Sequence, residues 1–356
     1  MYLYLAYLLS PVLIRVFLGL IPTFSQKQRN RILFNTMCIL MFSFIGFRSQ
    51  YIGSGDAQVY YATWERFSST NDFFAALSTS SMEHGFLLFV YIFSHVFHSG
   101  QFVFLFSALI ITYCVSSFIK ENCKNYMLAF LVMNAMGLFT FFLQGLRQSI
   151  AIAICLYAVR YCRRKKLLKF LLCGILAMMF HGSAVVFLPV YLIYGHEINI
   201  KTIALISICT IVLMAFLDRF IGIVNLILND SYAVGATNLT TGGTQTMLIY
   251  IGILIFAIAF HPVDADSERF CDYSFFLTLT YLALLFFSMR FYVNTIIERM
   301  SYYFILFVPC LLTNCVDRNR NINLLYFAVY SVFTFLAVYK GMTTSSFIPF
   351  VFFWQI

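Results

Sequence analysis

Long apolar stretches separated by short polar segments run along the whole chain. Several approach the roughly 20 residues that a helix needs to cross the hydrocarbon core of a bilayer. The candidate membrane helices are residues 2–21, 32–47, 85–97, 102–119, 126–143, 150–161, 167–180, 184–194, 202–220, 246–260, 271–289, 300–316 and 322–339. Because backbone groups in lipid must be hydrogen-bonded within the protein, this pattern predicts an all-α polytopic membrane protein that forms a single domain over residues 1–356.

The composition supports the same class of protein. Of the 356 residues, 62% are hydrophobic and 10% are charged, whereas soluble domains are about half apolar and about a quarter charged. A water-soluble fold of this length could not bury so much apolar surface, so lipid has to surround it. The 43 Phe and 23 Tyr residues suit positions that face lipid or the membrane interface.

The net charge of +9 comes from basic residues in short segments between the apolar stretches. One segment holds Lys27, Arg29 and Arg31, and another holds Arg163, Arg164, Lys165, Lys166 and Lys169. Basic residues in such segments mark the cytoplasmic side of a membrane protein. We therefore expect membrane lipids as partners and no binding of nucleic acid, which favours a continuous basic surface.

The two basic segments can share one side of the membrane only if an even number of helices crosses between them. Five candidates lie in that interval, so one of them does not cross. The candidate 85–97 is the weakest, because it has 13 residues and contains His95. We predict that it is a short re-entrant or interfacial helix, which leaves about 12 transmembrane helices. The loops 48–84 and 221–245 then face outward.

This topology places polar residues from separate parts of the chain at the outer face. Charged groups at the ends of membrane helices are costly unless they pair, line an aqueous cavity or bind a ligand. We therefore expect an outward site that draws on Arg48, Asp56, Glu83, Arg147, His181, Arg290 and Arg299.

Arg147 and His181 are the strongest of these candidates. Arg147 stands at the start of an apolar stretch, where a guanidinium can present a planar set of donors to a phosphate; the alternative is an arginine that extends to the lipid headgroups. His181 lies at a break between two short helices. It is either a structural hydrogen-bonding residue or a group that transfers a proton or donates to a diphosphate oxygen.

The remaining candidates have more than one interpretation. Asp56 and Glu83 are the outward carboxylates that could act as a general base. Tyr60, Tyr61 and Trp64 follow Asp56 and could contact sugar rings, or they could form an interfacial aromatic belt. Arg48, Arg290 and Arg299 are candidates for binding a diphosphate, although Glu298 could instead pair with Arg299 in a structural ion pair.

No cofactor is indicated by the sequence. The histidines show no metal-ligand spacing with a carboxylate, the ten cysteines form no CxxC pair, and no glycine-rich loop ends in the lysine of a nucleotide site. We expect chemistry that is independent of metal ions and of cytoplasmic nucleotides.

Four short motifs resemble those of the EpsG/Wzy family of bacterial polysaccharide polymerases. They are Arg48 with Gly53, Asp56 and Tyr60-Tyr61; Glu83-His84-Gly85-Phe86; Leu146-Arg147-Gln148 with Ala151; and Phe180-His181-Gly182-Ser183-Ala184 with Pro189. The resemblance extends over roughly residues 1–200.

The resemblance implies a multi-pass glycosyltransferase of the bacterial inner membrane with a periplasmic active face. Such an enzyme polymerises undecaprenyl-diphosphate-linked oligosaccharide repeat units into O-antigen or a related polysaccharide of the cell surface, including that of lipopolysaccharide. For this reaction we expect Arg147 with Arg290 or Arg299 to bind the diphosphate, where negative charge develops. His181 would support the leaving group or proton transfer, and Asp56 or Glu83 would be the base. A chain-length regulator protein is a candidate partner.

Two other functions fit the same residues. A flippase for lipid-linked glycans would also need arginines for the diphosphate, but it typically has two related halves, which the sequence does not show. An O-antigen ligase would use the same donor and leaving group with a different acceptor.

Overall fold

The structure is a computed structural model that describes residues 2–52, 56–78, 80, 82–196, 203–205, 207–208, 212, 243–260, 267–291, 298–316, 322–343 and 349–355. Most of the predicted helix 202–220 and nearly all of the predicted outward loop 221–245 therefore lie outside the described residues. The same holds for the glycine-containing stretch 53–55 that precedes Asp56.

Helices make up nearly all of the described chain, as the apolar pattern predicts. The described part contains no β-strand, and its one isolated bridge pairs Arg48 with Phe352. The helices are α1 (Tyr2–Gly19), α2 (Gln26–Gly46), α3 (Asp56–Ser68), α4 (Phe73–Ser78), α5 (His84–Val96), α6 (Gln101–Asn122), α7 (Tyr126–Ala135), α8 (Leu138–Phe142), α9 (Leu146–Arg163), α10 (Leu167–Phe180), η1 (Gly182–Phe187), α11 (Val190–Ile193), α14 (Thr244–Ala259), α15 (Ser267–Ser288), η2 (Met289–Phe291), η3 (Arg299–Tyr303), α17 (Phe307–Val316), α18 (Ile322–Thr343) and η5 (Phe353–Gln355).

Three of the described helices are long and apolar enough to cross a membrane by length and composition. They are α1, α6 and the part of α18 from Asn323 to Thr343, and shorter apolar helices accompany them. The chain is thus an all-helical membrane protein with clear apolar spans. The expected total of about 12 spans is not confirmed by these helices.

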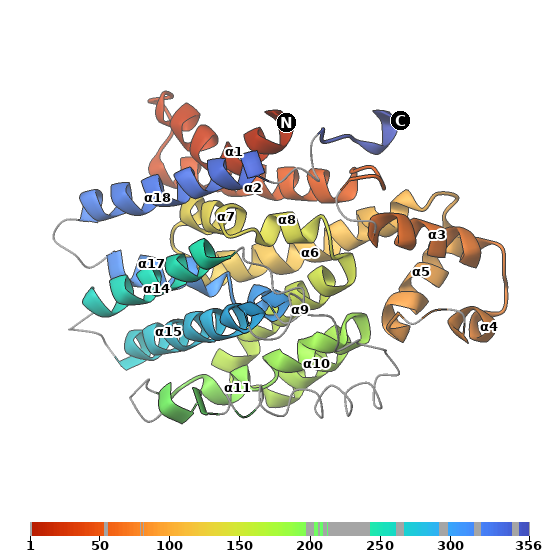
Figure 1. Cartoon of the computed structure of the whole chain (residues 1–356). Helices are drawn as coiled ribbons and strands as arrows, with labels where there is room; N and C mark the ends of the chain where they lie inside the picture. The colour runs from red at the N-terminus through yellow and green to blue at the C-terminus, as the bar shows by residue number, and fades with distance from the viewer. Residues whose placement is uncertain are drawn as a thin grey trace.

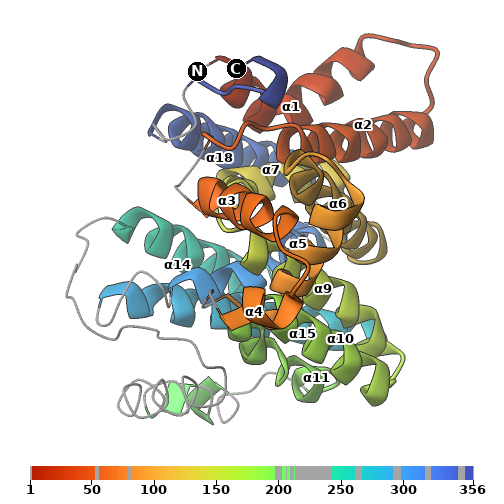
Figure 2. The same ribbon diagram turned by 90° about the vertical axis from the view of Figure 1, so that its right-hand side faces the viewer.

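The helices of the bundle run roughly side by side, and α3, α4 and α5 lie together at one end of it (Figures 1 and 2). The Gln101 side chain at the start of α6 donates to the Gly46 carbonyl at the end of α2 over 2.6 Å. At the other end, Arg160 near the end of α9 pairs with Glu121 near the end of α6 over 3.1 Å. These contacts fix which helix termini share an end.

The two basic segments consequently lie at one end of the bundle, and the ends of α2, α8 and α10 lie at the other. Between the two basic segments the chain runs along the bundle four times, through α2, α6, the pair α7–α8, and α9. An even number of passages brings both basic segments to the same end, as the charge pattern requires. α5 is a helix of 13 residues, as predicted, and its place at the end of the bundle agrees with a helix that does not cross.

The helix bounds differ from the apolar stretches at polar positions. α2 begins at Gln26 rather than at residue 32, because Ser25 and Gln28 form a capping box, so Lys27, Arg29 and Arg31 are helical. The expected helix 126–143 is divided into α7 and α8 at Gly137, whose φ of +84° suits glycine. Much of the expected loop 48–84 is helical as α3 and α4.

Candidate functional site

The Glu83 carboxylate is the centre of a polar cluster at the end of the bundle that holds α3 and α5. One carboxylate oxygen accepts a hydrogen bond from the Arg147 guanidinium in a salt bridge. The other accepts from the Gly182 backbone N–H over 3.2 Å and lies 3.8 Å from His181 Nδ1. We call Tyr60, Glu83, Arg147, His181 and Ser183 the Arg147 cluster.

Close packing of α5 on α10 brings these residues together. A Cβ atom on Gly85 would lie 2.6 Å from the Met179 carbonyl oxygen, so only glycine lets the first turn of α5 approach the last turn of α10 this closely. His181 ends α10 in an extended conformation. Arg147 lies in the first turn of α9, which carries it to the same end of the bundle.

Tyr60 orients the Arg147 guanidinium from a second direction. Its hydroxyl is hydrogen-bonded to the Arg147 side chain, and its ring packs edge-on against Phe86 with the centroids 5.1 Å apart. Burial raises the pKa of Tyr60 although the charge of Arg147 lowers it, so the phenol remains protonated. Glu83 and Tyr60 therefore fix the guanidinium in one orientation while a quarter of the Arg147 side chain stays exposed.

His181 is held as a neutral imidazole. Its Nδ1 accepts from the Ser183 backbone N–H over 3.3 Å and lies 2.8 Å from the Ser183 hydroxyl, so the ring proton is on Nε2. Burial, and then the charges of Arg147 and Arg299, lower the pKa of His181 to about 3. Ser183 in turn contacts the Tyr303 hydroxyl over 3.0 Å. The ring can thus donate a hydrogen bond from Nε2 at neutral pH.

Gln148 connects the Arg147 cluster to η3. Its side-chain amide donates to the Ser183 hydroxyl over 3.3 Å and to the Arg299 carbonyl over 3.2 Å. The Arg299 side chain is exposed, and its charge acts on His181. Arg299 therefore adds a second cation whose charge reaches His181 in the Arg147 cluster.

A second polar group includes Glu298, the residue directly before η3. Arg290 forms a salt bridge with Glu298 over 2.9 Å, and the charge of Lys340 also acts on Glu298. We call Arg290, Glu298 and Lys340 the Lys340 cluster. The sequence allowed an ion pair between Glu298 and Arg299. In the structure the Glu298 carboxylate pairs with Arg290 instead. Lys340 lies within α18, which extends beyond the predicted helix 322–339.

Arg48 is not part of either cluster. Its side chain is fully buried, donates to the Leu143 and Ile52 carbonyls and lies over the Phe104 ring, 4.9 Å from its centroid. The guanidinium thus holds the segment after α2 against the end of α8. The structure gives Arg48 a packing role and does not place it where a diphosphate could reach it.

Asp56, Tyr61 and Trp64 share α3 with Tyr60 but do not join the hydrogen bonds of the Arg147 cluster. Asp56 is the half-exposed first residue of α3, and its charge acts on Tyr60 and Arg48. Trp64 is 9% exposed and Tyr60 3% exposed, so neither ring offers an open face to a sugar. Tyr61 packs on Gly100 and is the most accessible of the three aromatic residues.

The sequence does not reveal the roles of four residues of the site, Gln148, Ser183, Tyr303 and Lys340. Gln148 and Ser183 belong to the motifs, but only their contacts reveal that they connect His181 to η3. Tyr303 and Lys340 lie in apolar surroundings, where a tyrosine or a lysine near a helix end is usually an interfacial residue. Within the described residues no group of three or more His, Cys, Asp or Glu side chains could hold a metal ion; metal independence remains a prediction.

A comparison with protein-family models finds a match to the EpsG family over residues 31–352. No curated protein and no solved structure matches the chain. The matched range contains every residue of both polar clusters and extends well beyond the roughly 200 residues of the motif resemblance. Because it covers nearly the whole chain, the protein belongs to the EpsG family, which includes polysaccharide polymerases.

Proposed function

We propose that the protein is a glycosyltransferase of the bacterial inner membrane that polymerises undecaprenyl-diphosphate-linked oligosaccharide repeat units. Membership of the EpsG family supports a membrane polymerase of glycans in general. The observation that carries the proposal is the fixed guanidinium of Arg147, held by Glu83 and Tyr60 and partly exposed beside neutral His181.

The arrangement suits the departure of a diphosphate from an anomeric carbon. Negative charge develops on the leaving oxygens, and donors already aimed at that position lower the barrier without reorganising. Arg147, Arg299 and the Nε2–H group of His181 would supply these donors. Arg147 and Arg299 are the proposed diphosphate ligands, and no metal ion is required for this step.

A base has to take the proton from the acceptor hydroxyl. Both oxygens of Glu83 already accept hydrogen bonds, so Glu83 is better suited to orient Arg147. Asp56 is half-exposed and close enough for its charge to act on Tyr60, which favours it as the base. Lipid tails would hold both substrates at one depth and so supply proximity.

The periplasmic side is the proposed location of the reaction. The basic segments at residues 27–31 and 163–169 lie at the end of the bundle opposite the Arg147 cluster, and basic residues mark the cytoplasmic side. The Lys340 cluster would hold the diphosphate of the second lipid-linked substrate. O-antigen and lipopolysaccharide are the proposed products, and a chain-length regulator is a proposed partner.

The test is chain growth by the purified protein in lipid vesicles supplied with a single lipid-linked repeat unit. We expect a ladder of products joined to one lipid carrier, with release of undecaprenyl diphosphate, in the presence of a metal chelator. A flippase would move the unit across the vesicle membrane without any ladder, and a ligase would need a separate acceptor. Either result would contradict the proposal.

A further inference from the structure

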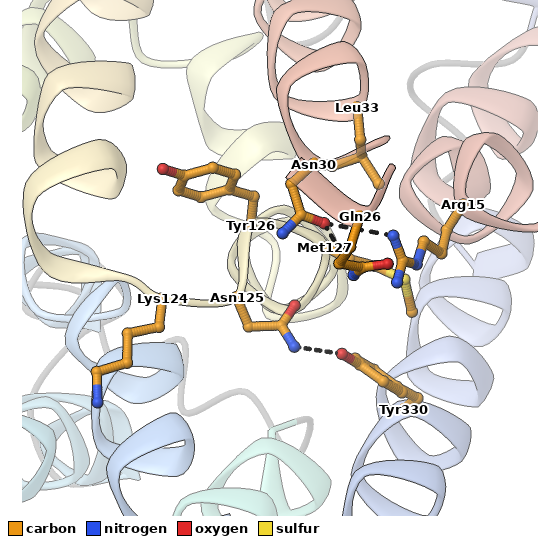
Figure 3. A pocket seen from close by; sticks show the side chains of 9 residues that line it. All are labelled: Arg15, Gln26, Asn30, Leu33, Lys124, Asn125, Tyr126, Met127 and Tyr330. Carbon is orange, nitrogen blue, oxygen red and sulfur yellow. Dashed lines mark hydrogen bonds between the residues drawn. The ribbon is translucent and has the colours of Figure 1, made fainter. Parts of the chain in front are cut away.

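A cavity of about 80 Å³ lies at the end of the bundle opposite the Arg147 cluster. Figure 3 shows that its walls come from four parts of the chain: α1, the first turns of α2, the α6–α7 connection and α18. The lining residues are Arg15, Gln26, Asn30, Leu33, Lys124, Asn125, Tyr126, Met127 and Tyr330. None of them takes part in the proposed glycosyl transfer.

The lining has the chemistry of an anion site. It contains two cations, Arg15 and Lys124, and side-chain amides from Gln26, Asn30 and Asn125, while no Asp or Glu among the described residues contributes to it. Arg15 turns inward, and its Nη1 donates to the Asn30 side-chain oxygen over 3.3 Å (Figure 3). An arginine that merely extended to lipid headgroups would turn outward.

Two helix N-termini reinforce this positive potential. Gln26 is the first residue of α2, and Tyr126 is the first residue of α7. The amides of a helix's first turn carry partial positive charge and favour anions. Asn125 caps α7 through its side-chain oxygen and donates from its amide nitrogen to the Tyr330 hydroxyl (Figure 3), so its donor faces this cavity.

Guanidinium and amide groups in this arrangement match the tetrahedral oxygens of a phosphate group. A guanidinium has five N–H donors in a planar fork, of which the bond to Asn30 uses one, and it binds phosphate through paired hydrogen bonds. Lys124 lies at the edge of the cavity with its amine turned away from Arg15 (Figure 3), where it adds charge rather than a direct contact. We propose that this cavity binds a phosphate group.

The phosphate could belong to the headgroup of an anionic lipid or to a soluble ion, because both present the same oxygens. The purified full-length protein would be titrated in detergent with phosphatidylglycerol, with diacylglycerol of the same acyl chains, and with inorganic phosphate. Native mass spectrometry would report lipid binding, and calorimetry would report phosphate binding. Diacylglycerol is the control for binding through the tails alone.

Variants isolate the cavity from other cationic sites on the protein. We expect Arg15→Gln and Gln26→Glu each to weaken binding roughly tenfold, which corresponds to about 1.4 kcal/mol. Gln26→Glu should not harm folding, because an acidic residue in the first turn of a helix is favourable. Lys27→Gln makes the same change of charge at the next, exposed position and should change binding by less than about twofold.

Each result has a defined meaning. A loss of binding with phosphatidylglycerol alone identifies a lipid headgroup, a loss with inorganic phosphate alone identifies a soluble ion, and a loss with both shows that the phosphate itself is recognised. Equal binding of diacylglycerol, unchanged binding in both variants, or an equal loss in Lys27→Gln would overturn the proposal. These outcomes do not depend on polymerase activity.

Discussion

The two polar clusters each contain an arginine–carboxylate ion pair but expose the charges of that pair differently. In the Arg147 cluster the Glu83 side chain is 6% exposed and the Arg147 side chain 25% exposed. In the Lys340 cluster Glu298 is 16% exposed and Arg290 13% exposed. In the Arg147 cluster the carboxylate is therefore more deeply buried than the cation, and the cation is the more accessible of the two charges. In the second, acid and base are buried alike, so less of the positive charge is available to a ligand.

The largest expected effect is at Arg147. Arg147→Ala removes the guanidinium that faces the proposed diphosphate, and we expect polymerisation to fall about 10²–10³-fold, as when one oxyanion donor is removed. Arg147→Lys should recover only part of the activity, because an ammonium group lacks the planar fork. The measurement is the polysaccharide ladder per amount of membrane-inserted protein.

Arg164→Ala is the matched control for Arg147→Ala. Arg164 is exposed at the opposite end of the bundle, so the ladder should be unchanged. A normal ladder in Arg147→Ala at a normal protein level would remove Arg147 from the mechanism.

A smaller effect is expected at Glu83. Glu83→Gln leaves Arg147 without its counter-charge. Removing one partner of a wholly buried ion pair lowers the free energy of unfolding by about 3–5 kcal/mol. Because Arg147 is partly exposed, we expect a smaller loss of about 2 kcal/mol. We expect a lower Tm in detergent together with lower activity. Glu83→Asp, which keeps the charge but shortens the reach, should recover the Tm more fully than the activity. An unchanged Tm for Glu83→Gln would show that the pair contributes little.

The Lys340 cluster should respond less than the Arg147 cluster. If the cluster holds the second lipid-linked substrate, Arg290→Ala should raise KM and leave kcat nearly unchanged. The expected rise in KM is roughly tenfold, because one charge-assisted hydrogen bond to the substrate is lost. If the cluster only stabilises η3, the Tm falls and KM stays the same. A loss of kcat as large as that of Arg147→Ala would show that the two clusters are not different in role.

A further effect, on stability rather than on activity, concerns pH. The pKa of His181 is lowered to about 3 in the folded protein and is about 6.5 in an unfolded chain, so between these values only the unfolded state binds the proton. The stability is therefore fully present above pH 6.5 and decreases as the pH falls, by up to about 1.4 kcal/mol per unit.

His181→Asn provides the comparison, because an asparagine oxygen can accept from the Ser183 amide but does not titrate. The Tm of the unmodified protein should decrease more between pH 7 and pH 5 than that of His181→Asn. Parallel curves would indicate that His181 keeps an ordinary pKa.

Sequence patterns predicted the features that depend on hydrophobicity and charge along the chain. The helical class, the short helix at 85–97 and the family follow from apolar runs and a few motifs, and Glu83, Arg147 and His181 lie together as the topology implied. The burial of Arg48 and the pairing of Glu298 with Arg290 could not be predicted, because both depend on side-chain directions. The division at Gly137 depends on a backbone conformation that hydropathy does not encode.

The backbone contact between residues 47–49 and 351–353 has a consequence for biosynthesis. Ser49 donates to the Val351 carbonyl and Phe353 donates to the Phe47 carbonyl, each over 3.0 Å. The two segments are about 300 residues apart in the sequence, and the chain is made from its N-terminus. The segment that leads from α2 toward α3 therefore cannot acquire its final hydrogen bonds until the ribosome has added residue 353.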